Sequence, residues 1–252
     1  MPLVYLRRLT GRERSQAANR ELAHYLSFIA GAANAGGYLA VGQYTSHMSG
    51  IVSAMADNLA VGGLQLMLAG LGALTAFTAG AAATAVMVNW GQRRSLESVY
   101  ALPLMVEAAL LVCFGLLGGH LEQDHVLRVS ATVILLCFTM GLQNAIITKI
   151  SKAVIRTTHV TGMVTDIGIE LGKLLYWNRH QRASTEVVAD RDKLRLLSSL
   201  VGLFFVGGVA GAVGFKRLGF VSVLPLAVVL VVLAIVPLLD DVRERRRGDA
   251  GA

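Results

Sequence analysis

Two short segments of the chain carry a histidine between hydroxyl side chains, a combination suited to hydrogen bonding and proton transfer. The first, Thr-Ser-His-Met-Ser-Gly, covers residues 45–50, and the second, Thr-Thr-His-Val-Thr-Gly, covers residues 157–162. Imidazole titrates near neutral pH, and hydroxyl groups both donate and accept hydrogen bonds. The pair predicts a polar binding site. Two histidines alone make a poor metal site, so we expect no metal.

The second segment also suggests recognition of an anion. A helix that begins at Thr157 or Thr158 exposes unpaired backbone N–H groups and the positive end of its dipole, and Arg156 stands directly before it. This arrangement predicts an anion or carboxylate site. Arg156 aligns with Tyr44 in the first segment, so charge recognition would be one-sided. The competing interpretation assigns Arg156 simply to the cytoplasmic set of basic residues.

Other polar residues extend the candidate site. Asn34 and Asn144 fall within apolar runs, where they could bind a solute or hydrogen-bond each other. The predicted solute-binding residues are Asn34, His47, Ser49, Gly50, Asn144, Arg156, Thr158, His159, Thr161 and Gly162. A proton relay through the two histidines would use Asp57, Asp166 or Glu170.

The motif search gives no support for catalysis. The chain has no Gly-x-Ser-x-Gly, no Walker loop, no His-Glu-x-x-His and no Cys-x-x-Cys pair. Nothing pairs a nucleophile with a base, so we expect no catalytic residue, no cofactor and no enzymatic activity.

The composition indicates which elements position these residues. Of 252 residues, 54% are hydrophobic and 15% are charged, whereas soluble domains have about 25% charged residues. A spanning helix needs about 20 apolar residues, and six long runs with few or no charges supply them. This arithmetic excludes a soluble enzyme, a disulfide-rich secreted scaffold and a disordered chain. We expect an all-α membrane protein with six transmembrane helices.

The basic residues predict the orientation of the chain. The net charge is +7, and 20 of the 23 Lys and Arg residues fall on one side if the N-terminus is cytoplasmic. This asymmetry follows the positive-inside rule, so both termini are expected in the cytoplasm. The basic residues are therefore explained by membrane insertion and by attraction to anionic lipid headgroups at the cytoplasmic face. We expect no nucleic-acid partner.

The second half of the chain repeats the first. Each half has three expected spans, an odd number, so the two copies must cross the membrane in opposite directions as an inverted repeat. Four pairs of anchors recur in the same order: 31–35 with 141–145, 45–50 with 157–162, Phe77-x-x-Gly80 with Phe205-x-x-Gly208, and 102–104 with 224–226.

This repeat divides the chain into two repeats and two terminal segments. Residues 1–21 form a basic cytoplasmic N-terminus and residues 240–252 a basic cytoplasmic tail. The first repeat covers residues 22–121, with an extra segment at 45–62 after its first span. The second covers residues 129–239, with an extra segment at 157–177.

Two geometries are open for the extra segments, which both have amphipathic patterns. They could be re-entrant half-helices from opposite faces, with their histidines meeting near the midplane, where irregular backbone must be packed in protein or line a cavity. They could instead lie flat in the two membrane interfaces.

The sequence resembles the YoaK family of uncharacterised bacterial multipass membrane proteins. The resemblance covers about residues 22–239 and rests on the segments 31–35, 47–50, 140–145 and 156–162. The family commonly has an acidic residue where this chain has Asn34, and Asn where it has Ile51. The resemblance implies a bacterial cytoplasmic membrane and carries almost no information about substrate.

Two functions follow as hypotheses. The inverted repeat and paired polar segments favour a small secondary transporter or facilitator for a small polar or anionic solute, with its site at the repeat interface. The alternative is a non-transporting membrane scaffold or regulatory protein, with a dry, closed repeat interface. A homo-oligomer is compatible with both.

Overall fold

The computed structural model describes residues 2–117, 125–151, 157–176 and 187–249, and the regular secondary structure in these ranges is helical. These ranges contain no strand. The helices are α1 (Pro2–Thr10), α2 (Gln16–Val41), α3 (Met48–Ala60), α4 (Leu64–Arg93), α5 (Ala101–Leu117), α6 (His125–Ile150), α7 (Val160–Leu175), α8 (Arg191–Leu218), the 3-10 helix η1 (Gly219–Val223) and α9 (Leu224–Asp249).

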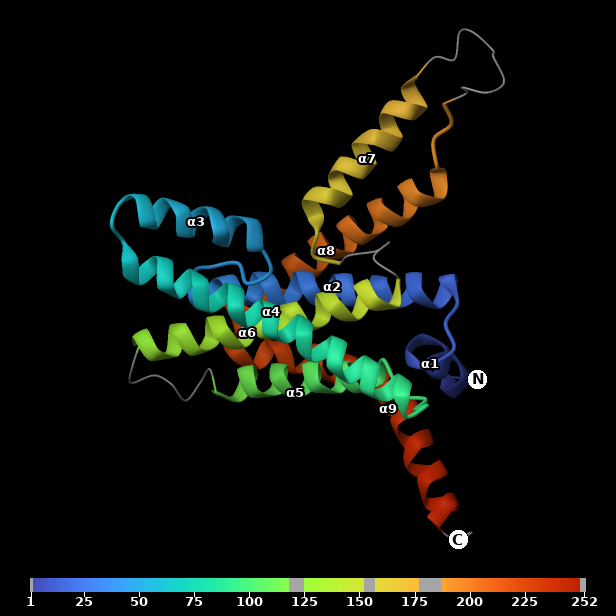
Figure 1. Ribbon diagram of the computed structural model, residues 1–252. Coiled ribbons are helices and arrows are strands. Elements are labelled where there is room, and N and C mark those ends of the chain that lie inside the picture. Colours follow the sequence, from blue (N-terminus) through green and yellow to red (C-terminus); the bar gives the residue numbers. More distant parts are fainter. Residues whose placement is uncertain (1, 118–124, 152–156, 177–186, 250–252) are drawn as a thin grey trace.

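A bundle of long helices forms the body of the protein, and three stretches of the described chain are long and apolar enough to cross a membrane. These are Leu64–Arg93, Ser130–Ile150 and Arg191–Glu244. α5 is a shorter apolar helix. α2 carries several polar residues yet has an extensive buried surface, because α8 and α6 pack against it (Figure 1). Its surroundings in the bundle, more than its own apolarity, hold α2 in place.

The third stretch is 54 residues long, which at 1.5 Å per residue far exceeds a bilayer core of about 30 Å. The chain turns at η1, so this stretch consists of two separate helices, α8 and α9 (Figure 1). Gly219 has a positive φ of 62°, which favours glycine at the start of this turn. The ring of Phe220 contacts Phe215 and Phe114 edge-on, with centroids 5.1 and 5.3 Å away, and so holds the turn against α5.

Polar contacts tie the two ends of the chain together. The Arg7 guanidinium lies 2.5 Å from the Asp240 carboxylate, and the Thr10 hydroxyl donates to the carbonyl of Leu233 at 2.7 Å. Asp241 is buried and accepts the backbone N–H groups of Glu97 and Ser98 at 2.7 and 3.0 Å. α1 and the connection before α5 are therefore both anchored to α9.

The closest helix contacts are made through glycines. A Cβ atom added at Gly31 of α2 would lie 2.0 Å from the carbonyl oxygen of Phe204 on α8. One added at Gly141 of α6 would lie 2.0 Å from the carbonyl oxygen of Phe77 on α4. Since real Cβ contacts are far longer, only glycine allows these backbones to approach so closely, as in other helix pairs packed through small residues.

Each contact has a reciprocal partner. A Cβ at Gly80 of α4 would lie 2.0 Å from the Phe138 carbonyl oxygen, and one at Gly207 of α8 would lie 2.1 Å from the Phe28 carbonyl oxygen. Gly141 lies 110 residues after Gly31, as Phe138 does after Phe28. Both the α2–α8 pair and the α6–α4 pair therefore use the same contact at equivalent positions.

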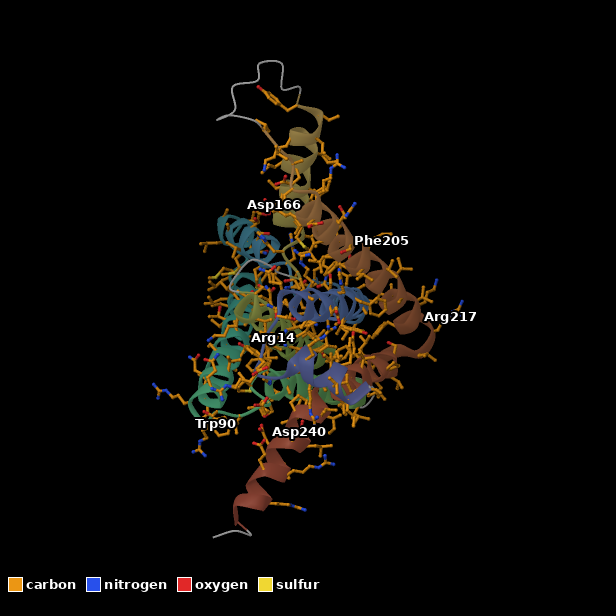
Figure 2. The ribbon with its side chains drawn as sticks, turned by 90° about the vertical axis from the view of Figure 1, so that its right-hand side faces the viewer. Arg14, Trp90, Asp166, Phe205, Arg217 and Asp240 are labelled. Carbon is orange, nitrogen blue, oxygen red and sulfur yellow. The ribbon has the colours of Figure 1, made fainter. Side chains whose placement is uncertain are left out.

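In these contacts, Phe77 corresponds to Phe204 and Gly80 corresponds to Gly207. The sequence alignment instead paired Phe77 with Phe205 and Gly80 with Gly208, one residue further along α8. Phe205 is 70% exposed and lies on the outer side of α8 (Figure 2). The doubled Phe204-Phe205 and Gly207-Gly208 allowed both alignments, and the helix contact distinguishes them.

We expect Gly31→Ala and Gly141→Ala to destabilise the protein, because the added methyl group meets a backbone carbonyl that cannot move away. Overpacking of this kind costs about 1–3 kcal/mol. Thermal unfolding of the purified protein in mild detergent measures the effect as a lower Tm. The matched control is Gly202→Ala on α8, where an added Cβ meets nothing within 4 Å. Equal Tm values for all three variants would contradict the close contact.

Candidate functional site

The two histidine-containing segments adopt the same local structure. His47 is the N-cap of α3 and His159 is the N-cap of α7, with similar backbone angles and no capping hydrogen bond from either side chain. Each imidazole lies over the glycine three residues later. A Cβ at Gly50 would lie 2.2 Å from His47 Cδ2, and one at Gly162 would lie 2.3 Å from His159 Nδ1. The glycine in each segment thus leaves room for the histidine ring.

The two helices begin close together and diverge. In Figure 1, α3 and α7 both start above the middle of α2. From there α3 runs back along α4, and α7 runs away from the bundle beside the first part of α8. α3 packs against α4, and α7 packs against α8. The first turns of two helices that are 112 residues apart in sequence therefore meet at one place.

A cleft of about 810 Å³ separates these first turns. It is framed by α2, α4, α6 and α8 together with the starts of α3 and α7. Its lining residues are Asn34, Tyr44, Ser46, His47, Met48, Ser49, Phe77, Asn144, Thr158, His159, Val160, Thr161 and Phe204. No Asp, Glu, Lys or Arg side chain is among these described lining residues.

The lining comes in equivalent pairs from the two halves of the chain. Every lining residue except Tyr44 has its counterpart in the same cleft: Asn34 with Asn144, Ser46 with Thr158, His47 with His159, Met48 with Val160, Ser49 with Thr161 and Phe77 with Phe204. Tyr44 aligns with Arg156, which lies outside the described residues. The ring of Tyr44 stacks on Tyr38, with centroids 4.4 Å apart.

Most of the expected binding residues therefore lie together. Asn34, His47, Ser49, Asn144, Thr158, His159 and Thr161 all line the cleft. Gly50 and Gly162 lie beneath the histidine rings instead. Sequence reasoning missed Phe77 and Phe204, whose aromatic side chains resembled ordinary packing residues. Within the described residues, no group of three His, Cys, Asp or Glu side chains gathers in a way that could hold a metal ion.

The two asparagines do not hydrogen-bond each other. Asn34 is 8% exposed, and its Oδ1 accepts the backbone N–H of Ser46 at 3.2 Å and the Ser46 hydroxyl at 2.9 Å. The Oδ1 atom of Asn144 is buried without a partner among the described residues. The second half of the cleft thus lacks the contact that holds Asn34.

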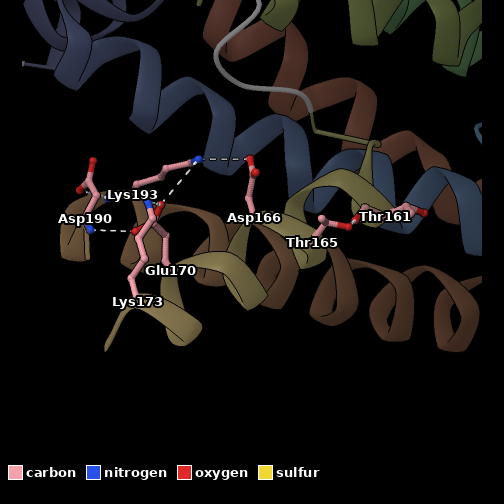
Figure 3. Close-up of polar contacts among 7 residues, drawn as sticks. All are labelled: Thr161, Thr165, Asp166, Glu170, Lys173, Asp190 and Lys193. Carbon is pink, nitrogen blue, oxygen red and sulfur yellow. Dashed lines mark hydrogen bonds and ion pairs between the residues drawn. The ribbon is translucent and has the colours of Figure 1, made fainter. Parts of the chain in front are cut away.

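The residues expected to relay protons lie elsewhere. Asp57 is exposed on α3, away from the cleft lining. Asp166 and Glu170 point toward α8 and join an ion-pair cluster with Lys173 and Lys193 (Figure 3). Glu170 Oε1 lies 2.9 Å from Lys173 Nζ, and Asp166 Oδ2 lies 3.4 Å from Lys193 Nζ.

Glu170 anchors α7 to the start of α8. It is only 2% exposed, and its Oε2 accepts the backbone N–H of Asp190 at 2.9 Å. That backbone hydrogen bond, followed by the hydrogen bond from Lys173, holds the pKa of Glu170 below its ordinary value of 4.5. A carboxylate that stays ionised at neutral pH suits a structural brace better than a proton relay.

A buried carboxyl group without a hydrogen-bond partner in the described part of the chain lies outside the cleft. Glu107 of α5 is fully buried, and neither carboxyl oxygen has a hydrogen-bond partner among the described residues. It does not line the cleft.

One comparison with known proteins identifies a family, and none identifies an activity. A family described as "Protein of unknown function (DUF1275)" matches residues 22–236. The chain belongs to this family. Comparison with curated proteins and with solved structures gives no match.

We expect Glu170→Gln to loosen α7 from α8 at neutral pH, because the amide cannot pair with Lys173 and Lys193 as a carboxylate does. Hydrogen exchange across α7 should become several-fold faster at pH 7. The folded-state pKa is lowered, so this stabilisation is complete above the ordinary carboxyl range and is lost as the pH falls through the lowered pKa.

The pH dependence provides the control. The wild-type protein should lose this protection on acidification, after correction for intrinsic exchange, and Glu170→Gln should show no such additional loss. Asp166→Asn, which removes only the more exposed pair at 3.4 Å, should have a smaller effect. Equal protection of α7 in wild type and Glu170→Gln at pH 7 would refute the brace.

Proposed function

We propose that the protein is a small secondary transporter or facilitator for a small polar or anionic solute, with the cleft as its solute site. In this proposal, α2, α4, α5, α6, α8 and α9 are six spans arranged as two inverted three-helix repeats. Both termini are cytoplasmic, and the membrane is the bacterial cytoplasmic membrane. The protein is not an enzyme.

The paired lining of the cleft carries this proposal. Equivalent residues from both halves of the chain face one space, and that space of about 810 Å³ falls within the 300–1,000 Å³ typical of small-molecule sites. Secondary transporters built from inverted repeats bind substrate where the repeats meet, often at the ends of broken helices. The first turns of α3 and α7 would provide those ends.

The directions of α3 and α7 support the re-entrant geometry over the interfacial one. Two helices lying flat in opposite interfaces would be separated by a hydrocarbon core of about 30 Å. Instead, their first turns share one cleft, and the two helices diverge from it (Figure 1). The repeated glycine contacts supply independent support for two equivalent halves.

A scaffold or regulatory function is the competing proposal. It calls for a closed interface between the two segments, and an open cleft lined by hydroxyl, amide and imidazole groups favours a solute instead. The YoaK resemblance is compatible with both functions. Contact of the basic termini with anionic headgroups, and assembly into a homo-oligomer, stay predictions.

We expect His159→Ala and Thr161→Ala to lower solute flux through the protein reconstituted in liposomes. Loss of a polar group that binds solute should reduce flux about tenfold or more. Radiolabelled acetate, phosphate, glycerol and choline serve as probes. Thr165→Ala is the control, because Thr165 lies one turn further along α7 and donates to the Thr161 carbonyl outside the cleft (Figure 3).

Flux of at least one probe should exceed that of empty liposomes and should survive Thr165→Ala. Flux that His159→Ala and Thr161→Ala leave unchanged would contradict the site. Absence of flux for all four probes would favour the scaffold.

A further inference from the structure

The orientation of the Asn34 amide is determined by its hydrogen bonds. A backbone N–H can only donate, so the atom that accepts from Ser46 N must be the amide oxygen. The other terminal atom of the side chain, Nδ2, is then the amide nitrogen. It makes no hydrogen bond among the described residues and is not one of the buried atoms without a partner. Asn34 lines the cleft, so its Nδ2 group offers free N–H donors there.

Asn144 presents its amide Nδ2 to the cleft from the second half of the chain. Its Oδ1 is buried without a partner among the described residues, which leaves Nδ2 as the accessible end of its amide at the cleft. The Asn34 oxygen is already bonded to Ser46, and the Asn144 oxygen is buried. The lining therefore offers a metal cation no carboxylate and no free, accessible amide oxygen.

The starts of α3 and α7 add more donors. The first hydrogen bonds of the two helices are donated by Ile51 and Met163. The backbone N–H groups of the three residues before each of them, 48–50 and 160–162, make no hydrogen bond to any part of the chain that the structure describes. Neither N-cap histidine supplies a side-chain acceptor. Two positive helix ends thus converge on a cleft that has no carboxylate in its described lining.

We propose that the cleft binds a small oxyanion, a carboxylate or phosphate-type group, and that the Asn34 amide nitrogen is one of its binding donors. This inference rests on the proposed function, because it takes the cleft as the solute site. Backbone N–H groups at helix starts, amide N–H groups and hydroxyls are the donors that bind such anions. The more exposed imidazoles of His47 and His159 lie at the same rim.

Asn34→Asp isolates the donor with little structural change. The aspartate keeps an oxygen that accepts from Ser46, and it replaces the amide nitrogen in the cleft with an anionic oxygen. Binding of an oxyanion should weaken about tenfold or more, because a donor becomes a repelling charge. Asn144→Asp makes the same change from the other half. Asn58→Asp is the control, since Asn58 lies on α3 outside the cleft and donates to the Ala54 carbonyl.

The experiment measures equilibrium binding to the purified full-length protein in detergent at constant ionic strength. The probes are inorganic phosphate, sulfate and acetate, with choline and glycerol as cationic and neutral comparisons. We expect at least one oxyanion to bind, Asn34→Asp and Asn144→Asp to weaken that binding, and Asn58→Asp to preserve it. Thermal unfolding without probe verifies that each variant is folded.

Three results would overturn the inference: no oxyanion binds, Asn34→Asp and Asn144→Asp both bind oxyanions as tightly as wild type, or choline or glycerol binds in place of the oxyanions. The flux experiments distinguish a failure of the oxyanion proposal from a failure of the transport proposal. Glycerol flux that depends on Thr161, without oxyanion binding, would preserve transport and refute the oxyanion. Oxyanion binding that depends on Asn34, without flux, would preserve the binding site and refute transport.

Discussion

The close approach of two helix pairs through glycine is the contact on which the rest of the structure depends. Gly31 meets the backbone of Phe204, and Gly141 meets the backbone of Phe77. The side chains of both phenylalanines line the cleft, and so do Asn34 and Asn144, each three residues after one of these glycines. The packing contact and the polar groups are thus adjacent on the same helices. A change in the helix distance would move the walls of the cleft directly.

The two histidine segments leave the first turns of α3 and α7 uncapped. Each begins a helix at a histidine whose own side chain does not cap it, so the first-turn N–H groups stay available. Backbone donors at depth in a membrane protein need a partner or an aqueous cavity. In the proposed membrane geometry, an aqueous cleft would meet that requirement for the first turns of both helices.

The common cleft of the two histidine segments and most of its lining were predictable from sequence, because both segments carry the same residue types at the same spacing. The phenylalanine register was not, because neighbouring Phe and Gly residues fit two alignments equally well. The role of Glu170 was also missed. Periodicity places it on a polar face, whereas Asp190 and Lys173, which surround it, come from the tertiary structure and the adjacent turn. The hydropathy pattern predicted six spans. By length and apolarity, the described helices contain three such stretches, because α2 is less apolar than these and α5 is shorter.

The central claim is that the two histidine segments meet in one cleft when the protein is in a bilayer. A distance measurement between spin labels at Ser49→Cys and Thr161→Cys tests it most directly, with Cys113 and Cys137 replaced by alanine and the protein in lipid nanodiscs. We expect a separation well below the thickness of the hydrocarbon core, about 30 Å. A separation equal to that thickness or greater would place the segments in opposite interfaces and contradict the shared site.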